Sequence, residues 1–250
     1  MGNPYLKNLN RIEFVMTYAC TGKCKHCSEG DHADCGEHMD GKAAARAVKK
    51  IAGQYAIQSL MTFGGEPLLY PEDVCEIHAA AKKAGIPKRQ LITNGYFSKD
   101  ENRITEVAGM LAESGVNDVL LSVDAFHQET IPTEPVLCFA KEVLAAGVPI
   151  RISPAWLVSR EHENPYNEKT REVIAKFAEL GIPVSGGNII FPSGNALKYL
   201  GEYFEKYGEP ENPYVDNPED VRCVSFNPDG SSSLGGNVYR ESMREVLEGY

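Results

Sequence analysis

The 250-residue chain has no apolar run that approaches the roughly 20 residues of a membrane span. Residues 1–7 lack the hydrophobic segment of a signal peptide, and Leu6 breaks the pattern for N-myristoylation. Basic residues are outnumbered, with 25 Lys and Arg against 35 Asp and Glu, and they are scattered. The net charge of −10 disfavours nucleic acid as the main partner, because binding phosphate backbones needs a basic stripe.

Cysteine is sparse outside one cluster. The seven cysteines are odd in number, and three of them fall within the segment Cys20-Thr-Gly-Lys-Cys24-Lys-His-Cys27. This distribution argues against a secreted disulfide framework and favours a reducing, cytoplasmic location. The hydrophobic content of 42% is ordinary for a globular protein, and the length suffices for one barrel-type domain.

Thiolates this close together can converge on one metal centre. Three ligands on a 4Fe–4S cluster would leave one iron open to an outside ligand. Zinc is the main alternative, with a fourth ligand from His26, His32, Cys35 or His38. The other alternative is that the three cysteines are buried thiols that bind no metal.

Repeated βα units follow the cysteine segment. Strands are predicted at 11–17, 59–63, 90–93, 118–123, 150–153 and 184–191. The helical stretches between them end at Gly85, Gly115, Gly147 and Gly181, each placed for a left-handed C-cap. Six such units, ending with an apolar helix face at 197–207, imply parallel strands with right-handed crossovers. A doubly wound open sheet and a partial barrel both satisfy this pattern.

A Gly-Gly-Glu-Pro segment closes the second strand. Paired glycines let a backbone approach a ligand, and a carboxylate can accept hydrogen bonds from an ammonium group. An ordinary turn is the alternative for Gly64, Gly65, Glu66 and Pro67 alone. Placed one βα unit after the three cysteines, however, the segment resembles the motif of the radical S-adenosylmethionine (radical SAM) enzymes.

This resemblance implies a six-unit partial TIM-type barrel, (β/α)6, over residues 1–207. It implies a 4Fe–4S cluster held by Cys20, Cys24 and Cys27, with His26 filling a position that is usually aromatic. It also implies SAM bound at the open iron, with Gly64, Gly65, Glu66 and Pro67 near its amino group, and a reductant such as flavodoxin or ferredoxin. The family cleaves SAM reductively to a 5′-deoxyadenosyl radical, which abstracts hydrogen from a substrate.

Parallel sheets place ligands at the carboxyl ends of their strands. The polar residues there resemble the family's SAM contacts, and they are Thr93, Asn94, Ser122, Asp124, Arg151 and Ser153. Arg151 is the candidate carboxylate clamp if its side chain faces inward. His127, just after the fourth strand, is the candidate substrate contact, with helix capping as its alternative. A solvated strand end is the alternative for the others.

The tail, 208–250, begins with a Pro- and Asn-rich linker. A short strand at Cys223, a turn at 227–230, a return strand at 231–236 and a helix at 242–247 are predicted. Cys223 and the turns resemble a reduced form of the SPASM or twitch extension of peptide-modifying radical SAM maturases. Cys223 is therefore a candidate hydrogen-atom donor, or a relic of an auxiliary cluster. Cys75 and Cys138 fit core thiols.

The extension favours modification of a peptide or protein side chain. The alternatives are a small-molecule radical SAM enzyme, a protein-radical activase and, from a different class, a zinc or iron–sulfur module without catalysis.

Overall fold

The computed structural model describes residues 3–31, 36–215 and 217–249. Its eight strands are β1 (Arg11–Val15), β2 (Ser59–Phe63), β3 (Lys88–Thr93), β4 (Asp118–Leu121), β5 (Ile150–Ile152), β6 (Ala155–Trp156), β7 (Asn188–Ile189) and β8 (Cys223–Phe226). The α-helices are α1 (Gly41–Ala52), α2 (Pro71–Lys83), α3 (Glu101–Ser114), α4 (Ala125–Gln128), α5 (Thr133–Ala145), α6 (Pro165–Ala175), α7 (Gly194–Tyr207) and α8 (Met243–Glu248). Short 3₁₀ helices are η1 (Pro4–Leu6), η2 (Pro67–Leu69) and η3 (Ala178–Leu180).

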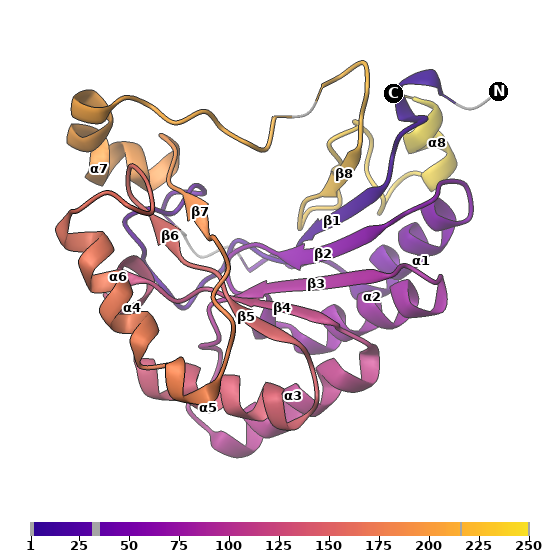
Figure 1. Ribbon diagram of the computed structural model, residues 1–250. Coiled ribbons are helices and arrows are strands. Elements are labelled where there is room, and N and C mark those ends of the chain that lie inside the picture. Colours follow the sequence, from indigo (N-terminus) through magenta and orange to yellow (C-terminus); the bar gives the residue numbers. More distant parts are fainter. Residues whose placement is uncertain (1–2, 32–35, 216, 250) are drawn as a thin grey trace.

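Six parallel strands form the main sheet, in the order β5-β4-β3-β2-β1-β8. The α/β class and the parallel βα units predicted from the sequence are confirmed. The long helices α1, α2, α3 and α5 lie on one side of this sheet, as Figure 1 shows. The other side is the inner face, and the chain between α7 and β8 passes over it.

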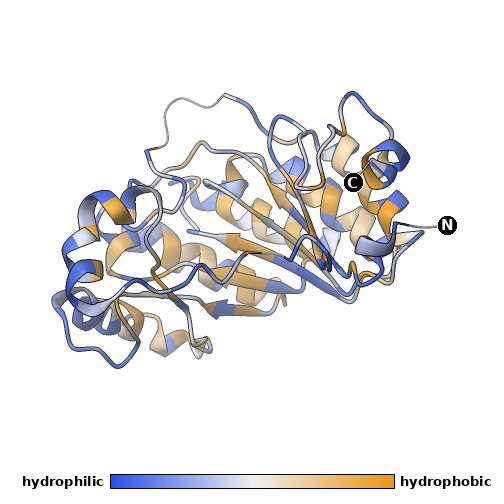
Figure 2. Ribbon diagram, turned by 90° about the horizontal axis from the view of Figure 1, so that it is seen from above, coloured by the Kyte–Doolittle hydropathy of each residue, from blue (hydrophilic) through white to orange (hydrophobic). Residues whose placement is uncertain are grey.

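Alternation along the strands explains why one face is covered. Ile12 and Phe14 on β1 are fully buried toward the helices, while Arg11 and Glu13 point to the inner face. Apolar residues therefore gather along the strands and the sheet-facing sides of the helices, as Figure 2 shows. Asp40 caps α1 by accepting a hydrogen bond from the Ala43 amide at 2.8 Å.

The repeating glycines end the units as predicted. Gly85, Gly115, Gly147 and Gly181 all have positive φ angles, between 65° and 86°. Side chains with a Cβ atom rarely adopt this left-handed conformation, so glycine is favoured at each helix end.

The sixth predicted strand, 184–191, is largely wrong. Val184 makes one parallel bridge to Ile152, and only Asn188–Ile189 forms a strand, which pairs with β6 outside the main sheet. Gly187 lies at φ +74°, and a Cβ there would stand 2.2 Å from the Pro154 carbonyl oxygen. The chain is thus kinked where a regular strand was expected.

The edge of the main sheet comes instead from the tail. β8 pairs in parallel with β1, and Phe226 stacks on Phe14 with ring centroids 5.1 Å apart. The predicted return strand at 231–236 is also wrong, because Ser231 and Ser232 make only isolated bridges. The division of the chain at residues 207 and 208 stays a prediction. No helix among the described residues has both the length and the apolar character needed to cross a bilayer.

Candidate active site

A pocket of about 250 Å³ opens at the carboxyl ends of β1 to β5. Most of the site residues predicted from the sequence line it, namely Cys20, Cys24, His26, Cys27, Gly64, Gly65, Thr93, Asn94, Ser122, Asp124, His127 and Ser153. Asn188, Ile189 and Tyr214, which the sequence analysis did not single out, line it as well. The strand ends therefore meet around one cavity, as expected for parallel βα units.

The cysteine loop is held by α7. The Asn195 amide donates to the Cys27 carbonyl at 2.9 Å, and its side chain donates to the Cys24 carbonyl at 3.2 Å. Gly194, at φ +50°, approaches so closely that a Cβ would lie 2.6 Å from the Cys27 carbonyl oxygen. Sequence analysis missed this role. Its only signal was the Gly-Asn pair at the start of a helix.

The two glycines after β2 allow a close approach of two backbones. A Cβ on Gly64 would lie 2.6 Å from the Thr17 carbonyl oxygen, and one on Gly65 would lie 2.1 Å from that of Ala19. The Gly65 amide donates to Thr17 at 2.7 Å. The backbone at the end of β2 is thus hydrogen-bonded to the start of the cysteine loop. Only glycine allows the two backbones to come this close.

Glu66 ties neighbouring strand ends together. Its fully buried carboxylate accepts hydrogen bonds from Thr93 Oγ1 at 2.7 Å, the Leu68 amide at 2.9 Å and the Asn94 amide at 2.9 Å. Burial raises the pKa of Glu66 to about 7, against the effect of these donors. The side chain does not line the pocket. The direct contact of Glu66 with a ligand stays a prediction, whereas its hydrogen bonds to Thr93 and Asn94 hold the end of β3 in place.

Fully buried Asp124 pairs with half-buried His127 beside the cysteines. Asp124 Oδ2 lies 2.8 Å from His127 Nδ1, and the carboxylate also accepts from the amides of Phe126, His127 and Ala155. Burial opposes ionisation, but the charge and hydrogen bond of His127 hold the pKa of Asp124 well below its usual range. The same pairing outweighs burial at His127 and raises its pKa. His127 is thus favoured as a cation.

His26 packs between these groups. Its ring lies 4.9 Å from the rings of Phe126 and His127, and burial lowers its pKa to about 4. Potential ligand atoms of Cys24, His26 and His127 lie within 4.8 Å of one another. Nδ1 of His26 is buried and finds no hydrogen-bond partner among the described residues.

Three thiols in one desolvated pocket fit a metal cluster. Burial raises the pKa of Cys20 to about 11 and raises that of Cys24 and Cys27 as well. Thiolates at such positions need a strong positive charge beside them, which iron would supply. Of the candidates for a fourth zinc ligand, His38 instead stacks on Tyr70 and pairs with Asp73. His32 and Cys35 lie outside the described residues.

Comparison with known families decides the assignment. The model of the family described as "Radical SAM superfamily" matches residues 14–206, more than half of the chain. This chain belongs to the radical SAM superfamily. It is therefore an enzyme of that superfamily, whose cofactors are a 4Fe–4S cluster and SAM.

Curated radical SAM relatives include a probable GTP 3′,8-cyclase from Saccharolobus solfataricus. It is 27% identical over 220 residues, which covers 79% of this chain and 65% of the relative. A second, from Metallosphaera sedula, is 26% identical over 52% of this chain and 38% of the relative. The chain thus spans at most about two thirds of the length of these relatives.

Solved structures share the radical SAM fold. Streptococcus suis SuiB bound to S-adenosylmethionine gives a TM-score of 0.64 at 14% identity, over 96% of this chain and 66% of that one. The structure of anSMEcpe with bound AdoMet gives 0.60 at 18% identity, over 96% and 77%. At these identities the likeness establishes the fold, including the partial barrel.

Besides Glu66, three predicted residues of the radical SAM site do not line the pocket. Pro67 is buried at the start of η2. The guanidinium of Arg151 pairs with Asp118 at 2.9 Å, and its role as a carboxylate clamp stays a prediction. Cys223 begins β8 in register with Arg11, at the opposite end of the sheet. Its role as a hydrogen donor stays a prediction.

Proposed function

We propose that this radical SAM enzyme modifies a side chain of a peptide or protein. The observation that carries the chemistry is the convergence of Cys20, Cys24 and Cys27 with the polar strand ends on one pocket. The peptide substrate is supported by fold-related structures, SuiB bound to the precursor peptide SuiA and anSMEcpe bound to a Cp18Cys peptide. It is also supported by the tail, whose division at residue 208 and SPASM-like character belong to this proposal.

In this proposal the three cysteines hold the 4Fe–4S cluster, which supplies the electron that cleaves SAM. The chain's own residues orient the reactants and exclude water. Gly64 and Gly65 present backbone to the SAM amino group, and Glu66 fixes their position from behind. The remaining SAM contacts are Asn94, Thr93, Ser122 and Ser153 at the strand ends.

Asp124 and His127 serve the substrate side of the pocket. Because Asp124 occupies Nδ1 of His127, Nε2 is the nitrogen left for contact with a ligand. The buried carboxylate raises the pKa of this imidazole, which favours its role as a hydrogen-bond donor to the substrate. Flavodoxin or ferredoxin is the proposed source of the electron.

The first experiment is anaerobic reconstitution with iron and sulfide, followed by incubation with SAM and dithionite. About four irons per chain and slow release of 5′-deoxyadenosine are expected for one cluster of this type. Cys24→Ala should lose the iron, whereas Cys138→Ala, on a helix away from the pocket, should retain it. Tight zinc without 5′-deoxyadenosine in the unmodified enzyme would reject the proposal.

The second experiment separates substrate classes. A deuterated cell extract is divided by size, and each fraction is incubated with the reconstituted enzyme and unlabelled SAM. Deuterium should appear in 5′-deoxyadenosine from the peptide fraction and disappear after protease treatment. Label from the small-molecule fraction alone would contradict a peptide substrate.

A small-molecule substrate is the second candidate, since the curated relatives are named GTP 3′,8-cyclases. GTP is accordingly incubated as a separate sample with the same assay. Conversion of GTP by the enzyme would establish this alternative. A protein-radical activase predicts instead that only intact protein, and no peptide, yields labelled 5′-deoxyadenosine.

A further inference from the structure

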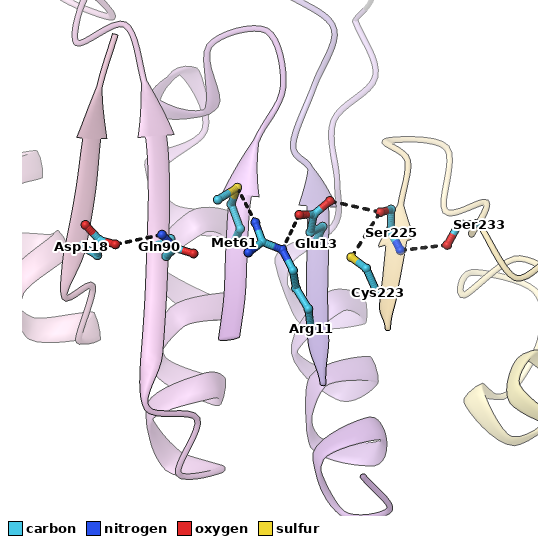
Figure 3. Close-up of polar contacts among 8 residues, drawn as sticks. All are labelled: Arg11, Glu13, Met61, Gln90, Asp118, Cys223, Ser225 and Ser233. Carbon is cyan, nitrogen blue, oxygen red and sulfur yellow. Dashed lines mark hydrogen bonds and ion pairs between the residues drawn. The ribbon is translucent and has the colours of Figure 1, made fainter. Parts of the chain in front are cut away.

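A polar row crosses the inner face of the sheet below the pocket. Glu13 is in register with Met61 on β2 and with Ser225 on β8, Met61 with Gln90, and Gln90 with Asp118. Residues in register on neighbouring strands point to the same face of a sheet, so all five point to the inner face, where Met61 and Gln90 are buried. We call them, with Arg11, the inner row; Figure 3 shows them side by side.

The row is closely connected to the pocket. Phe63 and Ile92 line the pocket, and they stand two residues beyond Met61 and Gln90 on the same strands. Two residues of a strand correspond to roughly 7 Å. Tyr214 also lines the pocket, and partial burial, then the charge of Glu13, raise its pKa. Phe63 and Ile92 therefore form an apolar layer between the pocket and the inner row, whose own residues do not line the pocket.

Hydrogen bonds run along the row from both ends. On one side Ser225 Oγ donates to Glu13 at 3.3 Å, and Arg11 Nε donates to the same carboxylate at 2.5 Å. On the other side Gln90 Nε2 donates to Asp118 at 2.8 Å. Asp118 can only accept, so it fixes which end of the Gln90 amide faces it.

The chain of bonds is broken at Met61. Arg11 Nη2 points to Met61 Sδ at 3.3 Å, and a thioether is a weak acceptor for a guanidinium. On the far side Gln90, only 2% exposed, carries a buried Oε1 without a hydrogen-bond partner among the described residues. Figure 3 shows this oxygen turned away from Asp118 and toward Met61. The gap thus offers a donor on one side and an acceptor on the other.

Each carboxylate of the row already has a cationic partner. Arg11 faces Glu13, and Arg151 at 2.9 Å and Lys88 at 3.7 Å face Asp118. An anion placed in the gap would meet the Gln90 oxygen and two carboxylates, while a cation would meet Arg11. A neutral group that accepts on one side and donates on the other satisfies both. The side chain of Met61 is unbranched and flexible enough to make room for it.

We propose that the inner row recognises an amide of the substrate, with its carbonyl on Arg11 and its N–H on Gln90 Oε1. This inference deepens the proposed function and rests on it, because the amide anchors the substrate below the pocket where SAM would react. The row then specifies a neutral amide rather than a carboxylate or a phosphate.

Three benzene derivatives test the proposed amide recognition. They share a phenyl ring, which can contact the apolar layer, and differ only in the group attached to it. Binding of N-methylbenzamide, methyl benzoate and benzoate to the reconstituted enzyme is measured by ligand-observed NMR. The amide should bind about five- to tenfold tighter than the ester, because one hydrogen bond to Gln90 distinguishes them. Benzoate should bind weakest. Tightest binding by benzoate would overturn the proposal and make Arg11 an anion site.

Variants assign the effect to residues. Gln90→Leu should abolish the preference for amide over ester, whereas Gln58→Leu, at an exposed position, should preserve it. Arg11→Met should weaken amide and ester alike, because both carry the carbonyl. An amide preference unchanged in Gln90→Leu would reject the proposed recognition.

The release of 5′-deoxyadenosine distinguishes failure of amide recognition by the inner row from failure of the proposed function. If the unmodified enzyme forms none, the radical SAM reaction fails while fragment binding still reports on the row. A nucleobase lactam carries the same donor and acceptor as a peptide amide. N-acetylasparagine methylamide and guanosine are therefore compared, and the one that loses affinity in Gln90→Leu is the class recognised. If neither does, the row is not a substrate surface.

Discussion

His78 makes the stability of the fold depend on acid in a measurable way. The ring is fully buried on α2, and Nε2 lies 2.9 Å from Thr62 Oγ1 on β2. Its Nδ1 has no hydrogen-bond partner among the described residues. Burial and, after it, the charge of Arg89 lower the pKa of His78 from 6.5 to about 3.

The sign of the effect follows from the two states. The unfolded chain takes up a proton at His78 near pH 6.5, while the folded chain resists it until about pH 3. Stability is therefore complete above pH 6.5 and falls as the pH drops from there toward 3. At about 1.4 kcal/mol per pH unit, the loss between pH 8 and pH 5 comes to about 2 kcal/mol.

Urea unfolding of the iron-free protein at pH 8 and pH 5 measures this loss. His78→Gln removes the titrating group and keeps a side chain that can bond to Thr62. The variant should lose about 2 kcal/mol less than the unmodified protein between the two pH values, whatever its own cost at pH 8. His162→Gln, at a half-buried position, serves as the control. Equal losses in His78→Gln and the unmodified protein would refute the reasoning.

Three further changes test the site itself. Gly65→Ala places a Cβ 2.1 Å from the Ala19 carbonyl oxygen, so iron retention should fall severalfold on reconstitution, whereas Gly109→Ala, with open space around its Cβ, should retain full iron. Asp124→Asn removes the charge that raises the pKa of its histidine partner, so the NMR-measured pKa of that imidazole should fall; an unchanged value would exclude this pairing as the cause. Cys223→Ala should leave 5′-deoxyadenosine formation intact and stall product formation if the thiol donates hydrogen, and unchanged product yield would remove that role.

Much of the fold could be predicted from local sequence patterns. The alternation at Ile12 and Phe14 and the glycine at position 115 depend only on neighbours in the chain, and sequence analysis placed them correctly. The cysteine spacing and the Gly-Gly-Glu segment likewise identified the family that the comparison established.

The errors lie where distant segments meet. Nothing near residues 184–191 signals that Gly187 must avoid the Pro154 carbonyl, because the two are far apart in the chain. The pairing of Cys223 with Arg11 depends on which edge of the sheet stays open. Sequence placed Arg151 at a strand end correctly, but its partner Asp118 emerges only from strand register and side-chain reach.

Glu66 and Gln90 are both buried polar residues near the pocket, but they differ in whether their hydrogen-bonding atoms have partners. Glu66 is buried at the strand ends, where its carboxylate accepts hydrogen bonds from Leu68, Thr93 and Asn94, so its substitution should disturb the pocket from behind. Gln90 is also buried, but its Oε1 accepts no hydrogen bond within the described part of the chain, which costs folding free energy. A buried polar atom left without a partner in the layer beneath a reactive pocket is the expected mark of a group that waits for a ligand.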